Sequence, residues 1–155
     1  MNCFRERRNV LPAITFLCLV CAAFFCSASA AGGELVDKTL VVWAQPANLE
    51  QRGSGTLSVL QGDAFDSIVL AEVRPKVWMP GSDHFNRTET DQKGWLEEAG
   101  LKMVCVVIVY EGKTVRLYRN ATLSAEYRID APQRFGRSAY VALGKRHANK
   151  GFFAG

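Results

Sequence analysis

Apolar and polar residues alternate with a period close to two along most of the chain after Lys38, and this alternation predicts β-strands. β-branched and aromatic residues crowd into short segments that are separated by Gly, Pro and Asn. The strands expected from this pattern are residues 39–44, 56–60, 67–73, 76–79, 102–110, 114–119, 122–128, 140–143 and 152–153. Only residues 94–100 suggest a helical turn. Short strands at intervals of about 8 to 15 residues predict an all-β, antiparallel two-sheet sandwich.

The most apolar of these segments is KMVCVVIVY, residues 102–110. Such a run is too apolar for a strand with one face in water, so we expect both of its faces to be covered. In the next segment Val115 and Leu117 fall on one face, and Arg116 and Tyr118 fall on the other. Asn120-Ala121 then joins this segment to the following one, which predicts a hairpin.

Residues 1–30 have the three parts of a secretory signal peptide. Arg5, Arg7 and Arg8 form a basic start, an almost wholly apolar run follows, and small residues precede Ala31. We expect cleavage after Ala30, which leaves one domain over residues 31–155 in a secreted, periplasmic or cell-surface protein. The alternative is a membrane anchor, for which about 17 apolar residues are at the short limit.

Removal of the signal peptide changes the charge and the cysteine content. The full chain carries 19 Lys and Arg against 15 Asp and Glu, and loss of three Arg and Glu6 leaves 16 against 14. A net charge of 16 − 14 = +2 does not favour nucleic acid as a partner. Cys105 is then the one remaining cysteine, so no intrachain disulfide is possible and the apolar core must stabilise the domain.

The chain offers no complete catalytic constellation. Glu89 and Asp91 are spaced like the strand carboxylates of sandwich-fold glycanases, but a third acid is absent and their surroundings read as a polar loop. His84, His147 and Cys105 are too few for a zinc site made from protein ligands alone. We interpret Cys105 as a core residue and the basic group around Lys145–His147 and Lys150 as a solvated loop.

Binding is the better supported chemistry. The loop between residues 78 and 95 mixes aromatic rings, which stack on sugar C–H surfaces, with groups that hydrogen-bond to hydroxyls. Its candidate ligand-binding residues are Trp78, Asp83, His84, Phe85, Asn86, Arg87 and Trp95. The alternative is ordinary packing of Trp78 and Phe85 beneath the loop. Calcium is a second possibility, because Asp63, Asp66 and Asp83 are expected in turns.

Three segments carry a resemblance to a known family: KTLVVWAQPANLEQRGSGTLSV, FDSIVLAEVRPKVWMPGSDHFNRT and VVIVYEGKTVRLYRNATLSAEY. Together they resemble the laminin G-like domains of the concanavalin A-like jelly-roll superfamily, in versions found in secreted bacterial proteins. The resemblance implies a non-catalytic module that recognises carbohydrate or an extracellular protein surface. The alternative is an accessory fragment of a secreted glycoside hydrolase of family 32 type, a fructan-cleaving enzyme whose catalytic module lies outside this chain.

The chain departs from the family pattern at two places. The hairpin of relatives ends in Tyr-Arg-Asn-Gly, whereas here Ala121 follows Tyr118-Arg119-Asn120, and Ala tolerates the positive φ of a type I′ turn poorly. Relatives also continue beyond a Phe-x-Gly segment into a further strand that closes a sheet. We therefore expect the last strand of the sandwich to be missing from this sequence.

Overall fold

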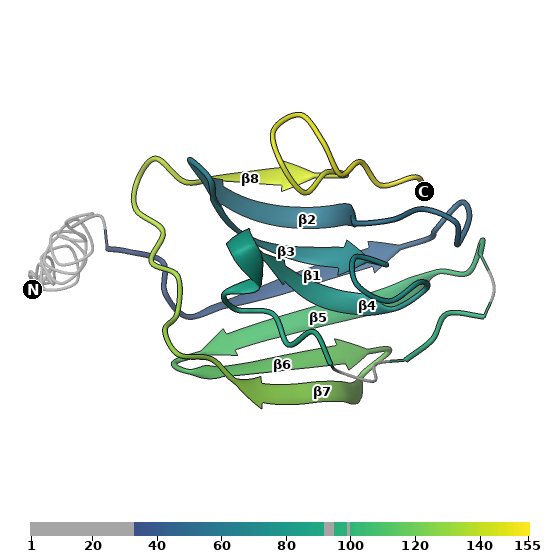
Figure 1. Ribbon diagram of the computed structural model, residues 1–155, viewed down its shortest axis with the longest axis horizontal. Coiled ribbons are helices and arrows are strands. Elements are labelled where there is room, and N and C mark those ends of the chain that lie inside the picture. The colour runs from purple at the N-terminus through teal and green to yellow at the C-terminus, as the bar shows by residue number, and fades with distance from the viewer. Residues whose placement is uncertain (1–32, 92–94, 99) are drawn as a thin grey trace, which may run out of the picture. The chain divides into compact units, whose positions relative to one another are not determined.

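The computed structural model describes residues 33–91, 95–98 and 100–155, and the predicted signal peptide lies outside them. The described residues form eight strands and one short 3₁₀ turn (Figure 1). In chain order these are β1 (Lys38–Ala44), β2 (Ser54–Gln61), β3 (Ala64–Leu70), β4 (Trp78–Ser82), η1 (Asp83–Phe85), β5 (Val104–Glu111), β6 (Thr114–Arg119), β7 (Thr122–Arg128) and β8 (Tyr140–Leu143). Within this part of the chain, no helix has the length and apolar character needed to cross a membrane.

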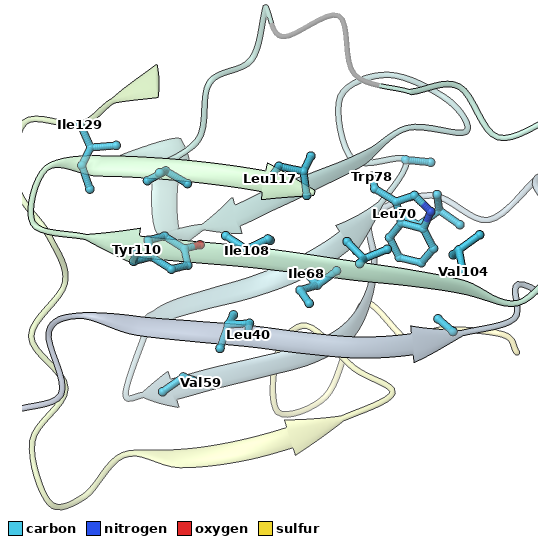
Figure 2. Packing of buried hydrophobic residues seen from close by; sticks show 14 of the residues in the cluster. Leu40, Val59, Ile68, Leu70, Trp78, Val104, Ile108, Tyr110, Leu117 and Ile129 are labelled. Carbon is cyan, nitrogen blue, oxygen red and sulfur yellow. The ribbon is translucent and has the colours of Figure 1, made fainter. Parts of the chain in front are cut away.

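Two antiparallel four-stranded sheets form a sandwich, as the alternation predicts. One sheet has the strand order β1-β5-β6-β7 and the other has the order β4-β3-β2-β8. The alternate residues that point inward from the two sheets make one apolar core (Figure 2). Ile68 and Ile108 lie near its centre and have no exposed surface.

Several strand boundaries differ from the prediction, and those of β3 and β4 have an identifiable physical reason. β3 begins at Ala64 rather than at Ser67, and it ends at Leu70 because Ala71 has a φ of 58° and turns the chain. β4 continues through Pro80 to Ser82, although the sequence predicts that this proline ends the strand. Proline is tolerated because β4 is an edge strand, where a missing N–H leaves no ladder partner unpaired.

Three further expectations are wrong. Residues 95–98 contain no helical turn, and Leu96 instead forms an isolated bridge with Val77. The outward residues of β5 are half-buried rather than covered, because only their neighbours on β1 and β6 shield them. The predicted strand at residues 152–153 amounts to one bridge between Lys145 and Phe152.

The turn between β6 and β7 has positive φ at both central residues, as a two-residue type I′ turn requires. Asn120 has a φ of 46° and Ala121 has a φ of 65°, so both central residues occupy the left-handed region. The Asn120 side-chain oxygen accepts a hydrogen bond from the N–H of Cys105 at 2.9 Å, which holds the turn against β5. Ala121 therefore adopts a backbone conformation that glycine adopts without strain.

Substituting Ala121→Gly should raise the free energy of unfolding by about 0.5 to 1 kcal/mol, because relief of the strain exceeds the added entropy of the unfolded chain. Gly112→Ala is the matched opposite change, since Gly112 has a φ of 53° and open space where an added Cβ would lie. It should lower the free energy by about 1 kcal/mol. Urea denaturation measures both changes, and equal stability of Ala121→Gly and wild type would contradict the strain.

Candidate ligand-binding site

A hollow of about 680 Å³ lies on the outer face of the sheet β4-β3-β2-β8. Its floor contains Leu60 and Phe65, which pair across β2 and β3 and form a small outer apolar cluster with Ala142. One wall is η1, which lies beside β3 and β4 in Figure 1, and the other is the loop of residues 147–150. The lining residues are Leu60, Gly62, Asp63, Phe65, Glu72, Ser82, Asp83, His84, Phe85, His147, Ala148, Asn149 and Lys150.

The η1 wall contains two consecutive residues in the left-handed region. His84 has a φ of 50° and Phe85 has a φ of 57°, values that cost non-glycine residues about 1 kcal/mol or more each. Backbone hydrogen bonds from Asn86 N to Asp83 O at 3.0 Å and from Thr88 N to Phe85 O at 3.1 Å hold this conformation. As a result the Phe85 side chain is 43% exposed at the hollow.

A buried arginine anchors η1 to the sandwich. The Arg87 guanidinium donates to Asp66 Oδ1 at 2.7 Å, to the Phe65 carbonyl at 3.0 Å, and to Asp83. Burial by itself lowers the pKa of Arg87, but the two carboxylates outweigh it and the pKa is raised. Burial raises the pKa of Asp83, but its bonds with Arg87 outweigh this and the net shift is downward. Both groups are therefore charged at neutral pH.

The second cation on Asp66 comes from the other sheet. Lys38, on β1, places its ammonium 2.8 Å from Asp66 Oδ2, and both side chains are buried. The same ammonium lies 4.4 Å from the ring centroid of Tyr110 and 5.1 Å from that of Phe135, so two aromatic faces also contact the charge. Asp66 thus joins β1 to the segment that carries η1.

The loop of residues 145–151 is bound to the outer face of the sheet. Ser58 Oγ donates to the Lys145 carbonyl at 2.8 Å, Arg146 is paired with Glu72, and the His147 ring packs edge-on against Phe65 with centroids 4.5 Å apart. Burial raises the pKa of Glu72 despite the opposing effect of Arg146. The interpretation of this basic cluster as a solvated loop is therefore wrong for Arg146 and His147, which are half-buried, whereas Lys150 is exposed as expected.

Gly55 makes this close approach possible. A Cβ at Gly55 would lie 2.5 Å from the backbone N and Cα of Arg146, a separation that real side chains do not reach. The Gly151 carbonyl completes the contact, because its oxygen accepts from Gly55 N at 2.9 Å and from Arg146 N at 3.0 Å. The absence of a side chain at Gly55 therefore determines where this wall of the hollow lies.

The structure separates the residues that the sequence predicts as one binding loop. Asp83, His84 and Phe85 line the hollow. Trp78 is only 2% exposed, and its indole Nε1 donates to Glu97 Oε1 at 2.9 Å inside the protein, so its assignment as a ligand-binding residue is wrong. Arg87 is buried in ion pairs and serves as an anchor instead.

Asn86 and Trp95 lie elsewhere. Asn86 is exposed but contributes to a different, smaller depression with Tyr127, while its amide donates to Asp83 Oδ2 at 3.2 Å. Trp95 is 52% exposed and lines a separate hollow of about 220 Å³ with Lys102 and Arg119. Neither residue therefore shares the hollow that contains Phe85.

The calcium hypothesis is not supported by the positions of its three carboxylates. Asp66 is fully buried between Lys38 and Arg87, and Asp83 is bound to Arg87, while Asp63 is exposed at the rim of the hollow. Two of the three carboxylates are thus already paired with cations of the protein. Among the described residues, no group of three or more His, Cys, Asp or Glu side chains is placed to hold a metal ion.

The sequence predicts as ligand-binding only three of the residues that line the hollow, Asp83, His84 and Phe85. Phe65, His147, Asn149 and Lys150 come from segments far from η1 in the chain. The available signals were the basic cluster after Lys145 and the paired glycines Gly53 and Gly55, but neither reveals which two segments meet. Comparison with known proteins gives no family model, no curated protein and no solved structure that matches the chain.

Asp66→Asn should lower the free energy of unfolding by about 3 to 5 kcal/mol, because it leaves the buried cations of Lys38 and Arg87 without their shared carboxylate. The matched control is Glu126→Gln, which removes an exposed partner of Arg116 and should cost less than about 1 kcal/mol. Chemical denaturation measures both values. Similar costs for the two variants would show that Asp66 has no special structural role.

Gly55→Ala should displace the loop of residues 145–151 and alter the hollow. We expect the amide resonances of His147–Lys150 to shift in two-dimensional NMR spectra, because the new methyl group collides with the Arg146 backbone. Gly136→Ala is the control, since the nearest atom to its added Cβ is a Gln61 side-chain nitrogen at 3.4 Å. Unchanged loop resonances in Gly55→Ala would rule out this steric role.

Acidification should destabilise the protein through His147. Burial, followed by the nearby charges of Arg146 and Lys150, lowers the pKa of His147 below its usual value of 6.5. Below about pH 6.5 the unfolded chain therefore binds the proton more readily than the folded chain, and the free energy of unfolding falls with pH until the folded pKa is reached. His147→Gln should flatten this slope as the pH falls through about 6.5, whereas an unchanged slope would assign it to other groups.

Proposed function

We propose that this chain is a secreted, non-catalytic recognition domain of laminin G-like type that binds carbohydrate in the hollow beside η1. The single observation that carries the proposal is the half-exposed Phe85 ring in an open hollow whose lining combines apolar residues with polar and charged ones. A flat aromatic surface suits the C–H face of a sugar ring.

The polar lining complements sugar hydroxyl groups. Asp63 supplies acceptors, Lys150 supplies donors, and the Asn149 amide supplies both. His147 also contributes a neutral imidazole at neutral pH, because burial lowers its pKa. Groups of both kinds around one aromatic ring are what a polyhydroxylated ligand requires.

Two of the three carboxylates that line the hollow are held in ion pairs, which favours binding over acid–base chemistry. Asp83 is held by Arg87 and Glu72 is held by Arg146. Two glycosidase carboxylates must instead face the scissile bond, one as acid and one as nucleophile or base. The positions of these ion pairs support a recognition role.

A glycan array probed with the full chain tests the proposal. The wild-type chain should be retained by a defined set of saccharides, and Phe85→Ala should weaken retention about tenfold through loss of the stacking surface. Trp95→Ala is the matched control because this aromatic residue lies at the separate hollow, and it should leave retention unchanged.

Thermal unfolding should confirm that Phe85→Ala is folded, since the Phe85 ring is only partly buried. Retention on no glycan by the wild-type chain would refute the proposed function. Retention that survives Phe85→Ala but is lost in Trp95→Ala would move the binding site to the smaller hollow and refute the assigned location.

A further inference from the structure

We infer that the free edge of β8 is a docking site for an extended segment of a partner protein, in which apolar and acidic residues alternate and which adds to the sheet as a further strand. The main-chain groups that would bind the segment lie at the edge of β8 rather than in the hollow beside η1, and the two sites share only Lys150. Three observations on β8 support it.

The first observation is the direction of the main-chain groups. Gly144 N donates to Thr56 O at 2.8 Å, and Gly144 lies opposite Thr56 in the register that pairs Leu143 with Leu57. Hydrogen-bonded and non-hydrogen-bonded pairs alternate along an antiparallel ladder. Val141 and Leu143 therefore direct their N–H and C=O groups away from β2, towards the side where β8 has no neighbouring strand among the described residues.

The second observation is the exposure of apolar side chains at the same edge. Val141 and Leu143 lie on the inner face of the sheet, yet they are 62% and 74% exposed. The reason is the offset of the two layers, because β1 lies opposite β2 and β3 while β8 extends beyond them (Figure 1). Edge strands that avoid association often carry a charged side chain on the inner face of the sheet. β8 has the sequence YVAL and carries no charged residue.

The third observation is the positive charge of the segment that contains β8 and the loop after it. Residues 131–155 contain five Lys and Arg and no Asp or Glu, and of these five Arg134 and Arg146 are paired with Glu34 and Glu72. Lys145 and Lys150 belong to the loop that follows β8 and is bound to the outer face of the sheet. A strand that pairs with β8 places alternate side chains on the two faces. Apolar residues would then cover the inner face beside Leu143, and acidic residues would meet the lysines on the outer face.

The test uses the full chain and three capped, fluorescently labelled peptides of about six residues, long enough to form one strand. The first alternates Val and Glu, the second alternates Val and Lys, and the third has the composition of the first with the three Val residues placed together. Fluorescence anisotropy should show that the alternating Val-Glu peptide binds at least about tenfold more tightly than either of the others.

Two variants locate the binding. Leu143→Lys places a charge at the exposed inner edge and should weaken binding of the Val-Glu peptide at least about tenfold, whereas Leu123→Lys on β7 changes a half-exposed leucine of the other sheet and should have no effect. Val141→Pro removes a main-chain donor that faces away from β2, so it should weaken peptide binding while thermal unfolding shows that the fold is kept.

Three results would overturn the inference. The first is equal binding of the Val-Glu and Val-Lys peptides, and the second is unchanged binding by Leu143→Lys. The third is concentration-dependent dimerisation of the chain that Leu143→Lys abolishes, because β8 would then pair with a second copy rather than with an acidic segment.

Discussion

The buried carboxylate of Asp66 is the constraint on which the rest of the structure depends. It sits on β3 between Lys38 from the opposite sheet and Arg87 from the segment after η1. Burial of these charges is unfavourable unless each one is paired, so the three groups can be buried only together. The pairing links the two layers of the sandwich to the short turn that forms one wall of the hollow.

The position of η1 follows from this linkage. Arg87 also holds Asp83, and the main chain around Asp83 keeps His84 and Phe85 in the left-handed region. Backbone strain of this kind persists only where the surroundings overdetermine the conformation, and it is common at binding sites. The backbone strain at His84 and Phe85 is therefore offset by the ion pairs of Arg87 with Asp66 and Asp83 inside the sandwich.

The opposite wall depends on close packing rather than on charge alone. Gly55 leaves room for the Arg146 backbone, and the Arg146 side chain then reaches Glu72. The same loop leads away from β8, whose free edge lies beside it. One segment of the chain thus contributes both to the hollow and to the edge at which we place a partner strand.

The sequence by itself determined the fold class and most of the strands, because burial of one face of a strand enforces a period of two that can be read residue by residue. It also identified Asp83, His84 and Phe85 as candidate ligand-binding residues, since aromatic and polar residues are mixed in this segment. It wrongly predicted that Trp78 binds a ligand, because a tryptophan is equally suited to an apolar core and to a sugar-binding site. Only the tertiary structure decided that Asp66 lies between two cations and that His147 packs on Phe65, since both contacts join segments far apart in the chain and no local pattern encodes such distances.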